Sequence, residues 1–151
     1  MDDKPERLGP ELVEAFVGSA HGDLEAVREL LAAEPVLANA AWDWGGGDWE
    51  TALGAAAHMG RRDIAELLLD RGARLDIFAA AMLGEVEIVR ALLAAFPGMR
   101  EARGPHGIPL VEHARKGGEQ ARQVLEFVKG GADRVEAEGT PERALPSFAA
   151  T

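Results

Sequence analysis

The chain has 151 residues, a formal net charge of −10 and no cysteine, and 47% of its residues are hydrophobic while only 5% are aromatic. This length predicts one small domain with a core built from Ala, Leu and Val. The negative charge argues against nucleic acid and anionic membrane surfaces as partners, because both attract basic proteins. The lack of cysteine excludes disulfides, thiol nucleophiles and thiolate metal ligands.

The chain begins with a charged segment that precedes the first predicted helix. Residues 1–9 are expected to form an N-terminal tail, and Met1 to Pro10 contain no apolar run, so no signal peptide is visible. The localisation therefore stays open, with the cytoplasm as the default expectation.

Four segments then repeat one pattern, in which small residues and a glycine precede a leucine-rich run. Apolar residues in these runs step by three and four, which predicts amphipathic helices, as at Leu24, Val27 and Leu30. A shorter, alanine-rich helix is predicted before each run. In chain order these short helices are Leu12 to Ala20, Thr51 to Met59, Ile77 to Leu83 and Pro109 to Lys116.

The spacing of the repeat is uneven. Its marker glycines are Gly22, Gly60, Gly84 and Gly117, which lie 38, 24 and 33 residues apart. A period in this range indicates stacked repeats that bury their apolar faces against their neighbours. The long interval predicts an enlarged loop between units 1 and 2. The short interval predicts that the connection between units 2 and 3 has lost its turn.

The second unit carries a family resemblance. Thr51 to Ala73, TALGAAAHMGRRDIAELLLDRGA, resembles an ankyrin repeat in its T-P-L-H-x-A-A opening, its helix-ending glycine and its closing L-L-x-x-G-A. The resemblance implies an all-α solenoid of four helix-turn-helix units over residues 10–132, with residues 133–151 as a C-terminal tail or cap. It also implies a binding scaffold whose concave face takes a protein or peptide partner, and no cofactor. We expect a monomer.

The enlarged loop, Ala41 to Glu50, departs most from the family pattern. It contains all three tryptophans and three carboxylates in ten residues, with no basic residue. These side chains suit a cationic group, through cation–π contacts and charge pairing. The alternative is that the tryptophans pack back as plugs over the loop. Gly45 to Gly47 lack the lysine and hydroxyl residue of a phosphate loop.

The histidines give limited support to a catalytic or metal site. His21 and His58 precede marker glycines, a register that often faces the groove in the family, while His113 is expected to be a packing residue. No metal-binding motif such as His-Glu-x-x-His occurs, so no metal is expected. His58 could pair with an acid of the loop for acid–base chemistry, but that requires geometry.

We therefore predict a binding module without catalytic residues, whose tryptophan-rich loop is the main contact. The alternative is a small-molecule pocket, enzymatic or not, formed by this loop and His58. The predicted site residues are Trp42, Asp43, Trp44, Asp48, Trp49, Glu50, His58, Met59, Met82 and His106.

Overall fold

The computed structural model describes residues 3–138, and their side chains through residue 130. The chain divides into two compact units, 1–74 and 75–151, where the length alone predicted one domain. None of the helices in the described part of the chain has the length and hydropathy of a membrane span.

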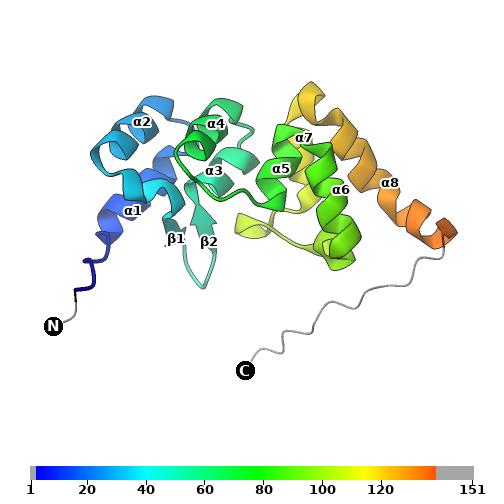
Figure 1. The fold of residues 1–151 in the computed structure, drawn as a ribbon, viewed down its shortest axis with the longest axis horizontal. Helices are drawn as coiled ribbons and strands as arrows, with labels where there is room; N and C mark the ends of the chain where they lie inside the picture. The colour runs from blue at the N-terminus through cyan, green and yellow to red at the C-terminus, as the bar shows by residue number, and fades with distance from the viewer. Residues whose placement is uncertain (1–2, 139–151) are drawn as a thin grey trace. The chain divides into compact units, whose positions relative to one another are not determined.

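The first unit consists of two helix pairs and a hairpin between them. In chain order its elements are α1 (Pro10–Ser19), α2 (Leu24–Ala33), the 3-10 turn η1 (Pro35–Asn39), β1 (Ala41–Asp43), β2 (Trp49–Thr51), α3 (Ala52–His58) and α4 (Arg62–Asp70). Within this unit the hairpin extends on the side opposite α2 and α4 (Figure 1).

The second unit also contains two helix pairs. Its elements are α5 (Ile77–Leu83), α6 (Val86–Ala95), the 3-10 turns η2 (Pro97–Glu101) and η3 (Pro105–Gly107), α7 (Leu110–Lys116), the 3-10 turn η4 (Gly118–Ala121) and α8 (Arg122–Glu138). The helix α8 continues to Glu138, past residue 132, where the repeat domain was expected to end. Part of the expected tail is thus helical, and residues 139–151 lie outside the described residues.

The helices begin where side chains cap their first turns. Asp23, Thr51 and Asp76 accept hydrogen bonds from the backbone N–H three residues later, at 3.0, 3.0 and 2.8 Å. Such caps satisfy N–H groups that have no partner inside the helix. The cap at Asp76 lets α5 begin soon after α4 ends, and no strand lies between them. This agrees with the short interval between the marker glycines.

The marker glycines do not all act alike. Gly60 and Gly84 adopt left-handed backbone conformations, with φ of 68° and 81°, as expected for glycines that end helices. Gly22 and Gly117 do not. Gly117 is needed for another reason, because a Cβ there would overlap the carbonyl oxygen of Met82 and the Cβ of Ala121.

The core is made of small residues on the short helices and one stripe of each long helix. Every residue of α3 from Ala52 to Ala57 is buried, and so is α5 from Ala79 to Leu83. Leu68 and Leu93 are buried in these stripes. Leu67 and Leu92 are half-buried instead, because they lie at the edge of the apolar stripe.

The expectation of an all-α fold holds for most of the chain but not for the enlarged loop. That loop is a two-stranded antiparallel hairpin in which Trp42 lies opposite Glu50 and Asp43 opposite Trp49. Tryptophans on both sides of three glycines, with the β-branched Thr51 at the end of β2, can pair in this way. The enlarged loop is therefore an ordered element rather than an irregular connection.

Candidate binding site on the hairpin

The hairpin turn is held by its own backbone and by one carboxylate. Asp43 accepts hydrogen bonds from the N–H groups of Gly45 and Gly47, at 2.8 and 3.0 Å for its Oδ1. Gly45, Gly46 and Gly47 have φ of 138°, 65° and 89°, which residues with a Cβ rarely adopt. Trp44 and Asp48 also pair through their backbones, Trp44 N–H donating to the Asp48 carbonyl at 3.0 Å. Asp43 thus has a structural role in the turn.

Alternation along β2 decides which loop side chains face outward. Trp49 is 62% exposed, whereas the next residue, Glu50, is 1% exposed. Successive side chains of a strand point to opposite faces, so these two residues cannot face the same way. Glu50, which we predicted to contact a ligand on the surface, is instead directed into the unit.

Glu50 is buried among three donors. Its Oε1 accepts a hydrogen bond from the indole N–H of Trp44 at 2.9 Å and lies 3.0 Å from Nε2 of His21. Its Oε2 lies 2.9 Å from Nε2 of His58. The rings of the two histidines meet edge to face, with centroids 5.1 Å apart. We call His21, Glu50 and His58 the histidine–glutamate cluster.

The surroundings of Glu50 keep it ionised. Burial raises the pKa of its carboxyl, but the hydrogen bond with His58, the charge of His21 and the hydrogen bond from Trp44 together outweigh burial, and the net pKa is lowered below its usual value. A buried carboxylate is tolerated when donors surround it in this way.

His21 was missing from the predicted site residues. It follows the end of α1, and its Nδ1 donates to the carbonyl oxygens of Val17 and Gly18, at 3.1 and 3.0 Å. The sequence contained one signal for it, since His21 and His58 both precede marker glycines. The sequence suggested that His58 could pair with an acidic residue of the loop. In the structure the acidic residue that contacts His58 is Glu50.

The tryptophans are not buried plugs. Trp44 is 39% exposed and Trp49 is 62% exposed, while Trp42 is half-buried. Trp44 nevertheless packs its ring edge-on against His21, with centroids 6.0 Å apart. It therefore combines a structural contact with a partly exposed face. Trp49 and Met59, which is also exposed, present apolar surface on the first unit.

The remaining predicted residues differ in position and exposure. Asp48 is half-buried at the hairpin. Met82 and His106 belong to the second unit. Met82 is fully buried, so the prediction that it lines a groove is wrong; its place inside the alanine-rich helix α5 puts it in the core. His106 is exposed and has a left-handed backbone, with φ of 61°.

His113 is a packing residue, as predicted. It is fully buried, its Nδ1 donates to the carbonyl of Pro109 at 3.0 Å, and its ring lies 4.8 Å from that of Phe78.

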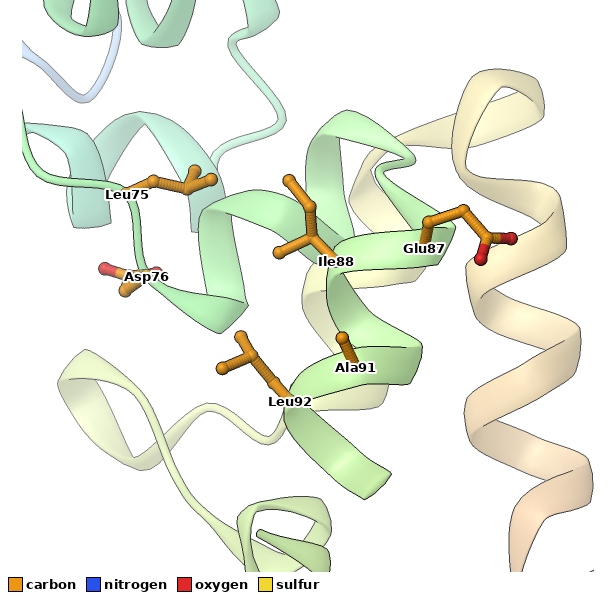
Figure 2. A pocket seen from close by; sticks show the side chains of 6 residues that line it. All are labelled: Leu75, Asp76, Glu87, Ile88, Ala91 and Leu92. Atoms are coloured by element: carbon orange, nitrogen blue, oxygen red, sulfur yellow. The ribbon is translucent and has the colours of Figure 1, made fainter. Parts of the chain in front are cut away.

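The second unit has a shallow, mainly apolar pocket of about 520 Å³. Leu75, Ile88 and Leu92 lie around it, as Figure 2 shows, and Asp76, Glu87 and Ala91 complete its lining. None of the predicted site residues lines this pocket. With one carboxylate at each side and no basic residue, it offers an apolar surface but no arrangement for catalysis.

Comparison with known proteins finds a family match that begins at the second strand of the hairpin. The Ankyrin repeat family model matches residues 48–78, from the second strand through α4 to the start of α5. Residues 48–78 form an ankyrin repeat. The matched ankyrin repeat contains Glu50 and His58 of the histidine–glutamate cluster and the exposed Trp49 and Met59.

A curated relative matches a longer part of the chain. The "Probable E3 ubiquitin-protein ligase XBOS31" of Oryza sativa subsp. japonica is 31% identical over 130 residues. The alignment covers 80% of this chain and 28% of the relative, so the chain spans little more than a quarter of that protein. Ankyrin repeats generally mediate protein–protein interactions, through the extended surfaces that stacked repeats present.

Proposed function

We propose that this chain is an ankyrin-repeat binding module of four helix-pair units, and that its hairpin is the main contact for a protein or peptide partner. In this proposal the partner lies on the concave face, which in ankyrin arrays is lined by the hairpins and the short helices. The observation that carries the proposal is the exposure of Trp49, at 62% of its surface, on an ordered hairpin. Tryptophan is enriched among the residues that dominate binding energy at interfaces.

The neighbouring side chains favour a cationic group on the partner. Trp44 and Trp49 offer aromatic faces, and Asp48 adds a carboxylate that is not fully buried. The chain as a whole carries a net charge of −10. An arginine or lysine side chain seated on an indole face would gain both a cation–π contact and attraction to the acidic surface. Met59 would extend the apolar part of the contact.

We propose binding without catalysis, and ubiquitin ligase activity is not part of the proposal. The relative's name describes a protein of which this chain matches 28%. The alternative function is a small-molecule site beside His58, which the 2.9 Å contact between His58 and Glu50 favours. A thermal-shift screen against amines, sugars and metabolites distinguishes the two, because only a small-molecule site predicts a saturable shift with one compound class.

The experiment selects partners from a displayed random peptide library and measures the affinity of the recovered peptides. We expect the peptides to be enriched in arginine and lysine, and Trp49→Ala to weaken their binding about tenfold or more, as for interface residues that dominate binding. Asp48→Asn should weaken it less. Phe96→Ala is the matched control, since Phe96 is an exposed aromatic residue of the second unit.

Stability measurements decide between a contact and a structural role. Trp49→Ala should leave the free energy of unfolding within about 0.5 kcal/mol of wild type, as for most exposed positions. Peptides without basic residues, or equal losses in Trp49→Ala and Phe96→Ala, would contradict the proposal.

A further inference from the structure

We propose that the histidine–glutamate cluster is a binding site for a divalent transition-metal ion of the zinc class. His21, His58 and Glu50 each offer one ligand atom, an imidazole nitrogen or a carboxylate oxygen, within 4.8 Å of the others. The direct separations from Glu50 are 3.0 Å to His21 and 2.9 Å to His58. Two imidazoles and one carboxylate are a ligand set that Zn²⁺ binds in proteins.

The ligands need only small movements to accept an ion. With zinc–ligand bonds of roughly 2.0–2.1 Å, tetrahedral geometry places neighbouring ligand atoms roughly 3.3–3.4 Å apart. The separations from Glu50 to His21 and to His58, 3.0 and 2.9 Å, are a few tenths of an ångström shorter, and they involve the two different oxygens of the carboxylate. Side-chain rotation of this size does not require a change in the backbone.

His21 is already oriented as a metal ligand. Its Nδ1 donates to the carbonyls of Val17 and Gly18, which places a proton on Nδ1 and leaves Nε2, directed toward Glu50, as the nitrogen that would give up its proton to bind an ion. Ligating histidines usually donate their second ring N–H to a carbonyl or carboxylate in this way. The Trp44 indole N–H, bonded to Glu50 at 2.9 Å, supplies an equivalent outer contact for the carboxylate.

The donor set also limits which ion fits. Imidazole nitrogen suits zinc and other late first-row metals, whereas Mg²⁺ and Ca²⁺ favour sites made of oxygen ligands. Glu50 is 1% exposed and His58 has 10% of its side chain exposed, so these two ligands are shielded from water, while His21 has 28% of its side chain exposed.

Such an ion would fasten the hairpin to two helix ends. His21 follows α1, Glu50 lies on β2, and His58 is the last residue of α3. The three segments are therefore joined through one point at the base of the hairpin. Metal binding would hold Trp44 and Trp49 in place without contacting a partner.

The first experiment uses the full chain without an affinity tag, after treatment with a chelator. Zn²⁺ is titrated by calorimetry, and Co²⁺ by its visible d–d absorption. We expect one ion per chain, a tetrahedral or five-coordinate Co²⁺ spectrum, and an increase of the melting temperature that saturates with the ion concentration. Mg²⁺ and Ca²⁺ at the same concentrations should produce no shift.

Variants locate the ion. His21→Ala and Glu50→Gln should each lower Zn²⁺ affinity by more than the roughly 10–100-fold typical of outer contacts, and Trp44→Phe should fall within that range. Glu29→Gln, an exposed carboxylate of the same unit, should have wild-type affinity. Equal affinity in wild type and in both ligand variants would place any bound ion elsewhere and overturn the proposal, as would an absence of binding below millimolar Zn²⁺.

A measurement on the wild-type protein tests the proposal even if the ligand variants do not fold. Long-range ¹H–¹⁵N spectra of the histidine rings should show that Zn²⁺ shifts Nε2 of His21 and His58 while His113 is unchanged. Unchanged His21 and His58 signals at saturating Zn²⁺ would overturn the proposal. Peptide binding is measured separately with a chelator present, so a failure of the metal site leaves the proposed partner binding untouched.

Discussion

Glu50 carries a buried carboxylate in the first unit, and burying such a group has a high free-energy cost. Removing an ionised carboxylate from water is costly unless donors surround it. Here the side chains of Trp44, His21 and His58 supply contacts at 2.9, 3.0 and 2.9 Å. These three side chains all depend on the carboxylate of Glu50. If that carboxylate is removed, they lose their shared hydrogen-bond acceptor.

The first prediction follows from this arrangement. In the presence of a chelator, Glu50→Ala should lower the free energy of unfolding by roughly 3–5 kcal/mol, as when one member of a buried ionic group is removed. Urea unfolding followed by circular dichroism measures it. Glu29→Ala, at an exposed position, should change stability by no more than about 0.5 kcal/mol. Similar values for the two variants would mean that Glu50 is hydrated in solution.

A second prediction at the residue scale concerns two glycines of the second unit. A Cβ at Gly117 would overlap Met82 and Ala121, whereas a Cβ at Gly130 would meet nothing within 4 Å. Gly117→Ala should destabilise by about 1–3 kcal/mol through overpacking. Gly130→Ala, inside α8, should instead stabilise by roughly 0.5–1 kcal/mol, because alanine is the better helix former. Thermal unfolding gives both signs, and effects of the same sign would contradict the packing at Gly117.

At the scale of the element, the long helices show how finely the apolar stripe is positioned. In α4, Leu68 is fully buried while Leu67 is half-buried, although both continue the leucine-rich run. The helical period of 3.6 residues turns adjacent side chains by about 100°, so only one of two neighbours can point at the centre of the core.

The third prediction separates these neighbours. Leu68→Ala should lower stability by roughly 2–5 kcal/mol, and Leu67→Ala by less, because a partly exposed side chain loses less buried surface and leaves less cavity. The same order is expected for Leu93 over Leu92 in α6. Chemical denaturation of the four variants measures the differences. If Leu67→Ala cost as much as Leu68→Ala, the helical phase of α4 would be misassigned.

The hairpin determines which side chains of the enlarged loop face outward and which face inward. Once Trp49 and Glu50 are neighbours on a strand, one must face outward and the other inward. The sequence did not distinguish the three acidic residues of this loop, but in the structure each of them has a different role. Asp43 caps the turn, Asp48 remains partly exposed, and Glu50 is buried in the histidine–glutamate cluster.

At the scale of the whole molecule, the acidic surface determines how a charged partner approaches. The chain carries 26 Asp and Glu residues against 16 Lys and Arg residues. The resulting field extends over roughly 8–10 Å at physiological salt and falls off more steeply as salt is added. It acts on association more than on the final contact.

The fourth prediction uses an arginine-rich peptide recovered in the selection as the probe. Raising NaCl should slow its association strongly while changing its dissociation rate little, because steering is screened and the indole contacts are not. Stopped-flow fluorescence of the tryptophans measures both rates. Trp49→Ala should have the opposite signature, with faster dissociation and nearly unchanged association. A salt-independent association rate would contradict a cationic partner.

The sequence by itself determined most of the helices and the resemblance of the second unit to an ankyrin repeat. Apolar spacing, the caps Asp23, Thr51 and Asp76, and glycines such as Gly60 and Gly84 act within a few residues, so their effect can be read locally. The ankyrin pattern around Thr51 to Ala73 overlaps the residues that the family model matches. The shortened connection before α5 followed from counting residues between glycines.

Only the tertiary structure decided which side chains meet. His21, Glu50 and His58 come from three elements, and no spacing in the sequence indicates that they converge. Whether Trp49 or Glu50 faces inward depended on strand pairing, since a shift of one residue would exchange the two faces of β2. Met82 was placed in a groove by its register, but close packing of the small-residue helices buries it. Contacts between distant segments depend on how elements pack together, and local patterns do not encode that packing.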